Sequence, residues 1–313
     1  MKSGIVNYNI AAEKAIVEMQ SDIGAIESDP LLFEEKNFDR RTEAVDFIEF
    51  QIIDRIEVLL EETNLLDELL LLKYRAEKVK SELEGINNSV FRKLQEDIRK
   101  GEYTGTGFMS LVNEYADFNL GDNEHQKEPG YDNLDIFING LLSLKTMPEQ
   151  TRDLEPEMVF YQKTPVRIIF ELVEKINFNK DDVFYDLGSG LGQVAILVNL
   201  LSGVATKGIE FEPAFYDYAR DCAAELDLSD ITFINADARQ ADYSDGTMFF
   251  MYTPFNGGIL QEVLEILRKE SLRRKIKIVT YGPCTTEIAL QSWLDFAGPK
   301  DDNIYKLAVF SSS

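Results

Sequence analysis

The most constraining feature of this 313-residue chain is a glycine-rich turn that follows a short apolar run. The apolar run 183–185 ends in Asp186, and a second apolar run, 194–198, predicts a helix directly after the turn. Between them glycine stands at every second position: Gly188, Gly190 and Gly192. Glycine is needed where φ is positive or where the backbone closely approaches a ligand. The segment therefore predicts a strand, a tight turn and a helix N-terminus in an α/β fold.

The spacing of the three glycines separates this turn from a dinucleotide-binding turn. Such a turn has the pattern Gly-x-Gly-x-x-Gly around a bound pyrophosphate. At the third glycine of that pattern this chain carries Gln193, and Asp186 just before the turn would repel a pyrophosphate. The turn therefore disfavours a nicotinamide dehydrogenase and favours a cationic or hydroxylated ligand.

Three further predicted strands also end in a polar residue or a turn. Glu210 ends the run 204–210, about twenty residues beyond the turn, where a carboxylate can hold ribose hydroxyls. Asp237 follows the run 231–235 and is placed to accept a hydrogen bond from the exocyclic amine of adenine. The run 248–252 ends in a turn. In open α/β sheets a ligand lies outside the carboxyl ends of the strands, so we expect these residues to share one site.

Together these strand ends resemble the class I S-adenosylmethionine-dependent methyltransferases over roughly residues 155–310. The resemblance implies an α/β fold, a Rossmann-like seven-stranded sheet closed by an antiparallel strand, with S-adenosylmethionine as the cofactor. It implies that Asp186 and Gly188 lie beside the methionine part of the cofactor. Glu210, followed by Phe211, is expected at the ribose. The remaining strand-end pair, Asp237 and Ala238, is expected to frame the adenine.

The segment 156–164 and the glycine turn resemble more closely the non-SET lysine methyltransferases of the disruptor-of-telomeric-silencing type. Tyr161 and Thr164 match the loop Tyr-Gly-Glu-Thr of that family, which implies a role as a cofactor lid, whereas Gln162 and Lys163 do not match. The family turn, Asp-Leu-Gly-Ser-Gly-x-Gly-Gln, is matched through its polar and glycine positions: Ser189, Gly190 and Gln193.

The residues after the fourth strand are expected where the methyl group emerges. Tyr252 and Thr253 are the predicted substrate-facing residues, and Phe255 is predicted to wall the acceptor channel. The family has an Asn-rich segment at this point, and this chain departs from it. A dry aromatic channel would favour a neutral amine by lowering its pKa. We therefore expect methylation of a protein lysine or another amine. The alternative is a cofactor-binding interaction protein that has lost turnover, which the changes at residues 162–163 and in the Asn-rich segment motivate.

Charge and composition limit the classes of partner, metal and compartment that this chain is expected to have. The formal net charge is −24, which argues against binding to nucleic acid because phosphates need Lys and Arg. The same charge suits a basic protein substrate, although it also serves solubility alone. Two cysteines indicate a reducing compartment, so we expect a cytoplasmic protein. The single histidine, His125, and the absence of a His/Cys cluster predict no metal site. No apolar run is long enough to span a membrane.

The first half of the chain reads as helical, with apolar residues three or four apart between residues 45 and 83. Thr63 and Asn64 are poor helix formers and are expected to divide one long helix. The apolar face predicts either a homodimer through these helices or packing onto the catalytic half. Shorter helices are expected at 108–115 and 134–144. The polar segment 148–157 sets the expected boundary between an N-terminal helical domain, 1–150, and a methyltransferase domain, 151–313. Near the C-terminus we expect Trp293 in a helix and a final strand over residues 304–310.

Overall fold

The structure is a computed structural model that describes residues 2–118, 130–143, 145–296, 298 and 303–313. His125 lies outside these residues. The chain forms two compact units. The helical unit comprises Met1–Leu94 with Asn113–Asp117, and the sheet unit comprises Gln95–Val112 with Phe118–Ser313. Within the described parts of the chain, no helix is both long and apolar enough to cross a membrane.

The helical unit contains three long helical stretches whose apolar faces meet. They are α1 (Lys2–Glu27), α2 (Phe38–Phe47) continued by the π-helical turn η2 (Ile48–Ile53) and α3 (Asp54–Glu62), and the larger part of α4 (Leu66–Arg99), with a short 3₁₀ turn η1 (Pro30–Phe33) after α1. The helix does break at Thr63 and Asn64, as predicted. Most of the predicted apolar stripe is buried inside this unit, whereas Leu66, Leu70 and Tyr74 are exposed. A homodimer through these helices stays a prediction, and it would have to use exposed residues such as Leu71.

The sheet unit is built around seven strands in the order β3-β2-β1-β4-β5-β7-β6, which confirms the predicted seven-stranded sheet. The strands are β1 (Val183–Leu187), β2 (Ala205–Glu210), β3 (Ile231–Asn235), β4 (Met248–Met251), β5 (Lys277–Thr280), β6 (Leu294–Phe296) and β7 (Ala308–Ser312). Strands β1 to β5 are parallel, and β7 pairs antiparallel with both β5 and β6. The order reverses at β1, so the switch point lies beside the glycine turn.

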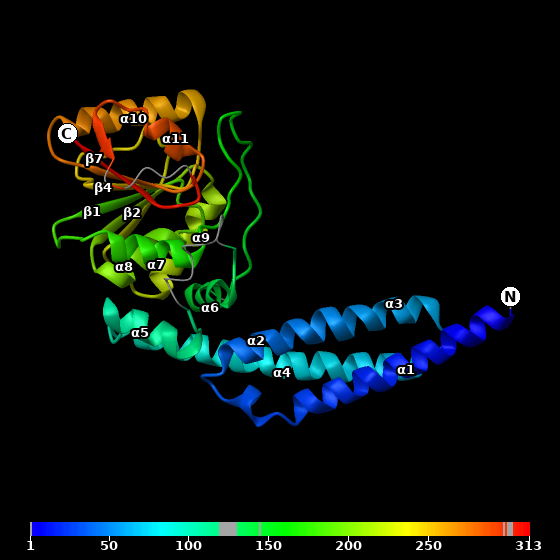
Figure 1. Ribbon diagram of the computed structural model, residues 1–313. Coiled ribbons are helices and arrows are strands. Elements are labelled where there is room, and N and C mark those ends of the chain that lie inside the picture. Colours follow the sequence, from blue (N-terminus) through cyan, green and yellow to red (C-terminus); the bar gives the residue numbers. More distant parts are fainter. Residues whose placement is uncertain (1, 119–129, 144, 297, 299–302) are drawn as a thin grey trace. The chain divides into compact units, whose positions relative to one another are not determined.

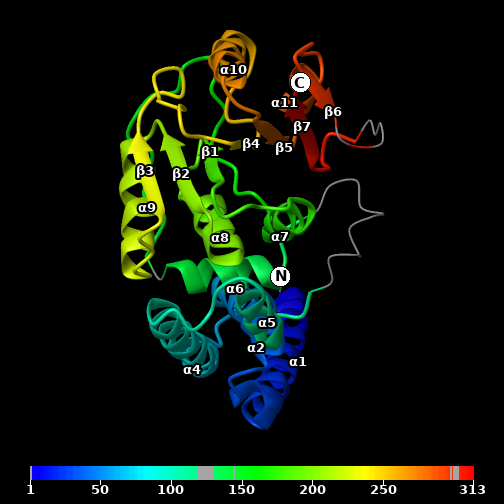
Figure 2. The same cartoon turned by 90° about the vertical axis from the view of Figure 1, so that its left-hand side faces the viewer.

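Helices cover both faces of this sheet (Figures 1 and 2). On one face lie α7 (Val166–Lys175), α8 (Gln193–Ser202) and α9 (Pro213–Glu225), and on the other lie α10 (Gly257–Ser271) and α11 (Cys284–Ile288). Side chains alternate along β1, so Tyr185 and Leu187 pack in the core under α10. Asp186 therefore points to the face covered by α7 and α8.

Residues 95–112 and 130–143 belong to the sheet unit, so the structural division falls well before residue 150. Helix α6 (Asn133–Leu142) begins at Asp132, which caps it in a capping box with Asp135. The buried Asp135 carboxylate also accepts a hydrogen bond from the backbone N–H of Val166 at 2.9 Å, which fixes α6 to the start of α7. Gln95 donates to the carbonyl of Leu141 at 2.9 Å. The other short helix, α5 (Thr106–Tyr115), matches the predicted one.

Two expectations near the C-terminus are wrong. Trp293 is not in a helix, because α11 ends at Ile288 and Trp293 lies in the turn before the short edge strand β6. The final strand begins at Ala308 rather than at residue 304, where the chain is still in a loop. The three residues of β6 form an edge that only β7 supports, which explains why no apolar pattern announces it.

Candidate active site

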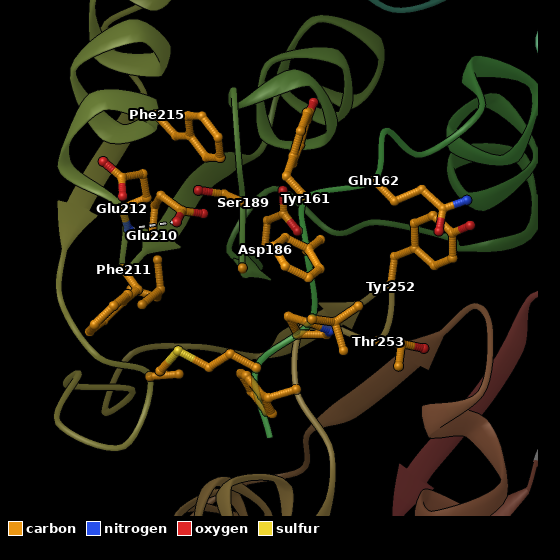
Figure 3. A pocket seen from close by; sticks show the side chains of 18 of the residues that line it. Tyr161, Gln162, Asp186, Ser189, Glu210, Phe211, Glu212, Phe215, Tyr252 and Thr253 are labelled. Atoms are coloured by element: carbon orange, nitrogen blue, oxygen red, sulfur yellow. Dashed lines mark hydrogen bonds between the residues drawn. The ribbon is translucent and has the colours of Figure 1, made fainter. Parts of the chain in front are cut away.

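The carboxyl ends of β1, β2 and β4 open into one pocket (Figure 3). It is lined by every residue predicted to bind the cofactor or to face the substrate, except Gly190: Tyr161, Thr164, Asp186, Gly188, Ser189, Gln193, Glu210, Phe211, Asp237, Ala238, Tyr252, Thr253 and Phe255. Glu210 and Tyr252 lie on opposite sides of the pocket, and Asp186 lies between them (Figure 3). Residues from four strand ends and from the loop before α7 thus meet in one place. Their roles toward a ligand remain predictions.

The three glycines of the β1–α8 turn are required by the packing of the chain on itself. All three have positive φ, between 51° and 82°. A Cβ at Gly188 would lie 2.3 Å from Pro254, and one at Gly190 would lie 2.1 Å from the Tyr161 ring. At Gly192 a Cβ would meet Phe233 at 2.6 Å. The glycine spacing therefore lets neighbouring side chains reach the turn, a reason that spacing alone does not reveal.

Asp186 is a buried acid that faces another acid. Burial raises the pKa of its carboxyl group to about 8, and the nearby Glu210 carboxylate contributes to the shift. Its Oδ2 atom has no hydrogen-bond partner among the described residues. A buried carboxylate is costly unless it is paired. The site thus favours a ligand with a positive charge or hydrogen-bond donors at this point.

Glu210 both lines the pocket and holds the glycine turn. Its Oε2 atom accepts a hydrogen bond from the backbone N–H of Gly190 at 2.6 Å, and its Oε1 atom accepts one from Glu212 N at 2.8 Å. Burial raises the pKa of Glu210, although these two hydrogen bonds oppose the shift. Each carboxylate oxygen can still accept a hydroxyl group, so the predicted ribose role fits the geometry.

Asp237 lines the pocket with its carboxylate already paired to a cation. Arg239 donates from Nε and Nη2 to Asp237 at 3.0 and 2.6 Å, and it also reaches Glu155 at 2.7 Å. The hydrogen bonds from Arg239 lower the pKa of Asp237. The neighbouring Ala238 carbonyl accepts from the Tyr243 hydroxyl at 2.7 Å. The pair that is predicted to frame adenine is therefore rigidly held, and Arg239 is a supporting residue that sequence reasoning missed.

The loop 150–164 closes one wall of the pocket and is tied to β2 through Glu212. The Glu212 carboxylate accepts hydrogen bonds from the hydroxyl of Thr151 at 2.5 Å and from Arg152 N at 2.8 Å. It also caps α9 by accepting from Ala214 N at 3.0 Å. Burial alone would raise the pKa of Glu212, but the hydrogen bond from Thr151 and those from the backbone lower it. No local sequence pattern marks this contact, because Thr151 lies sixty-one residues before Glu212.

At the other end of this loop, the ring of Tyr161 packs on the glycine turn and lies 5.3 Å from the ring of Phe215. Thr164 is buried at the start of α7. Tyr161 thus stands against the turn and Thr164 lines the pocket, while their role as a cofactor lid stays a prediction.

The predicted acceptor end lies where β4 leaves the sheet. Thr253 has a positive φ of 43°, which is rare for a β-branched residue. Its hydroxyl accepts from Cys284 N at 3.1 Å and lies 3.4 Å from the Tyr281 carbonyl, so it holds this bend. Tyr252 packs against Tyr281 with ring centroids 4.8 Å apart, and Phe255 is buried in the core. Tyr252 and Phe255 both line the pocket, whereas Tyr281 is buried beside Tyr252 and does not line it. The aromatic acceptor channel stays a prediction.

The polar groups of the glycine turn fit the predicted cofactor. Besides Asp186, the hydroxyl of Ser189 and the whole amide of Gln193 are buried without a hydrogen-bond partner among the described residues. Buried polar groups are normally hydrogen-bonded, so unpartnered ones at the end of a pocket indicate a polar ligand. Hydroxyl, ammonium and carboxylate groups of S-adenosylmethionine would satisfy them.

Comparison with known proteins agrees with this geometry. Residues 155–250 match the family model described as histone methylation protein DOT1, which is less than half of the chain. Comparison with curated proteins gives no significant match.

Solved structures that are similar to this chain are methyltransferases of several kinds. An RNA methyltransferase from Salinibacter ruber in complex with S-adenosyl-L-homocysteine has 24% identity over 48% of this chain and 92% of that one, with a TM-score of 0.39. A precorrin-6y C5,15-methyltransferase from Geobacter metallireducens has 17% identity over 50% and 92%, with a TM-score of 0.36. A putative S-adenosyl-L-methionine-dependent methyltransferase from Methanococcus maripaludis has 14% identity over 47% and 83%, with a TM-score of 0.37.

The family match covers the loop that closes the pocket, the glycine turn and the ends of β2 and β3, which are the parts that form the cofactor half of the site. The strand order, with β7 antiparallel between β5 and β6, matches the sheet that the sequence led us to expect. The protein is therefore a class I S-adenosylmethionine-dependent methyltransferase whose core, residues 155–250, is similar to the DOT1 histone methylation proteins.

Proposed function

We propose that the methyl acceptor is an amine on a basic protein, in the first place the side chain of a lysine. The observation that carries this proposal is the character of the acceptor end of the pocket. Gln162 and Tyr252 lie at this end (Figure 3), and the uncharged lining of the pocket also includes Phe160, Pro283 and Tyr305. The charged residues among the described lining, Asp186, Glu210, Glu212 and Asp237, belong to the cofactor half.

Such a channel suits an amine for two physical reasons. Desolvation disfavours the charged form of a lysine and lowers its pKa, so the lone pair needed for attack becomes available. Aromatic faces also hold a cation while it enters or leaves. S-adenosylmethionine supplies an already activated methyl group, so alignment of the acceptor contributes most of what this chain has to do.

The charge of the whole chain supports a basic partner. A formal net charge of −24 raises the encounter rate with a positively charged protein and repels a phosphate backbone. The family model that matches the core is named for histone methylation, which makes core histones a reasonable first probe. We further propose a cytoplasmic location, which rests on two free, buried cysteines, Cys222 and Cys284.

The proposal is tested with S-adenosylmethionine that carries a radiolabelled methyl group. The protein is incubated with core histones and, separately, with a cell lysate, and the products are divided into protein and nucleic acid before acid hydrolysis. We expect label as Nε-methyl-lysine in protein, and we expect it to be lost in the Asp186→Asn variant. Label found in RNA or DNA, with none in protein, would show that the acceptor is wrong.

A further inference from the structure

Gln162 stands at the acceptor end of the pocket, at a position where the side chain is exposed and the backbone is fixed. It lines the pocket on the side of Tyr252, away from Glu210 (Figure 3). On one side of it the ring of Tyr161 packs on the glycine turn. On the other side the Nζ atom of Lys163 donates to Asn139 at 2.7 Å, so the Lys163 side chain is held away from the pocket.

The amide of Gln162 is both exposed and uncommitted, a combination that the two other glutamines lining the pocket lack. Gln150 donates to the carbonyl of Arg152 at 2.5 Å, and the unpartnered amide of Gln193 is buried beside the glycine turn. Gln162 makes no side-chain hydrogen bond to a described residue. A loop anchored on both sides thus presents a free amide at the mouth of an otherwise aromatic channel.

We propose that Gln162 positions the acceptor nitrogen, with its Oε1 atom accepting a hydrogen bond from an N–H of the incoming amine. The inference rests on the proposed amine acceptor and adds the residue that selects it. Thr253 does not compete for this role, because its hydroxyl is engaged by Cys284 N.

A neutral amide is suited to this task in a way that a carboxylate is not. A carboxylate at the same place would stabilise the ammonium form and raise the pKa of the acceptor, which would withhold the lone pair needed for attack. An amide oxygen orients the N–H of the acceptor amine without adding a charge, so desolvation in the channel still determines the pKa of the amine. Gln162→Glu therefore should strengthen binding of a cationic amine and slow transfer at neutral pH, two effects that a merely structural role would not combine.

The test uses two cofactor analogues that differ in one group. Both carry nitrogen in place of the sulfur of S-adenosylhomocysteine, one with a butyl arm and one with an aminobutyl arm. Calorimetry gives the affinity of each analogue, and of S-adenosylhomocysteine itself, for the wild type, Gln162→Leu and Gln162→Glu. Gln150→Leu is the matched control, because it removes a pocket glutamine whose amide is already used within the chain.

We expect the wild type to prefer the aminobutyl arm, and Gln162→Leu to reduce that preference by about threefold to tenfold, the size of one hydrogen bond. Gln162→Glu should increase the preference and shift the acidic limb of the rate profile for core histones to higher pH. Affinity for S-adenosylhomocysteine should stay within about twofold throughout, because this residue lies away from the cofactor half. An unchanged preference in Gln162→Leu overturns the role of Gln162. A wild type that binds S-adenosylhomocysteine but ignores the amine overturns the amine acceptor as well.

Discussion

At the scale of single residues, Asp186 is the least favourably placed charged group of the site. A carboxylate buried beside another carboxylate destabilises the folded chain until a cationic ligand arrives. Its folded-state pKa of about 8 lies above the unfolded value of 3.8. The folded state therefore binds the extra proton, and the stability that this group contributes is lost as the pH rises from about 4 to about 8.

Asp186→Asn should consequently stabilise the protein without ligand while it weakens cofactor binding. The gain in unfolding free energy should grow with pH between about 4 and 8, by at most about 1.4 kcal/mol per pH unit, and level off above 8. Thermal melts of both proteins across this range measure it, and titration with S-adenosylmethionine gives the loss of affinity. A constant difference between the two proteins at all pH values would contradict the buried, titrating carboxyl group.

Glu210→Ala should weaken cofactor binding by roughly 1.5–3 kcal/mol, the size of a hydrogen bond to a charged group. The structure adds a second cost, because the N–H groups of Gly190 and Glu212 lose their acceptor. We therefore expect a lower melting temperature in a protein that still folds. Asp217→Ala, which removes an exposed acid on α9, is the control and should change neither value. An unaltered dissociation constant in the folded Glu210 variant would remove it from the ribose site.

The polar residues at strand ends can be predicted from the sequence, whereas the residues that contact them cannot. Asp186, Glu210 and Asp237 are recognised because each ends an apolar run. The Arg239 pairing of Asp237 and the contact of Tyr161 with Gly190 depend on how distant segments meet. The second of these joins residues twenty-nine positions apart, which no local pattern encodes.

At the scale of elements, the β1–α8 turn can be tested with two glycines that both have positive φ. Gly190 and Gly203 both have positive φ, 51° and 71°, but a Cβ at Gly203 meets nothing within 4 Å. Gly203→Ala should cost only the backbone strain, about 1–2 kcal/mol. Gly190→Ala adds a clash with the Tyr161 ring, and we expect a clearly larger loss of stability together with loss of cofactor affinity.

Chemical denaturation and cofactor titration of the two variants measure the difference. Equal losses in both proteins would mean that the Tyr161 ring does not rest on the turn. A smaller loss in Gly190→Ala than in Gly203→Ala would contradict the packing even more directly.

Elements with a strong apolar period are those that sequence predicts well. Helices α5 and α6 and strands β1 to β4 lie within a few residues of the predicted ranges. Strand β6 was not predicted, because its three residues form an edge strand that pairs with β7 alone. The bend at Thr253 was not predicted, because β-branched residues rarely adopt a positive φ. A hydrogen bond from Cys284 N, which lies beyond β5, holds Thr253 in this conformation.

At the scale of the whole molecule, the sequence predicted a helical half and a sheet half but placed their division too late. The polar segment 148–157 looked like a linker, yet it crosses the pocket and is tied to Glu212. The helical segment before it joins the sheet unit because Asp135 binds the start of α7. A polar segment in the sequence does not by itself mark a domain boundary, because contacts between distant segments determine which residues form a compact unit.

The net charge of −24 leads to a prediction about salt. If long-range attraction brings a basic substrate to the site, the KM for core histones should rise several-fold between low salt and about 0.3 M, where charges are screened within a few ångströms. The KM for S-adenosylmethionine should change far less, because its contacts are buried. A short peptide with one lysine among neutral residues is the matched substrate, and a salt effect as large for that peptide would contradict electrostatic attraction of the substrate.

The pocket at the carboxyl ends of β1, β2 and β4 is built for S-adenosylmethionine rather than for a dinucleotide. Isothermal titration of the purified chain with S-adenosylmethionine and, separately, with NAD tests it most directly. We predict saturable binding of one S-adenosylmethionine per chain, with Asp186→Asn and Glu210→Ala each weaker, and no heat from NAD. Binding of NAD with no heat from S-adenosylmethionine would contradict the account.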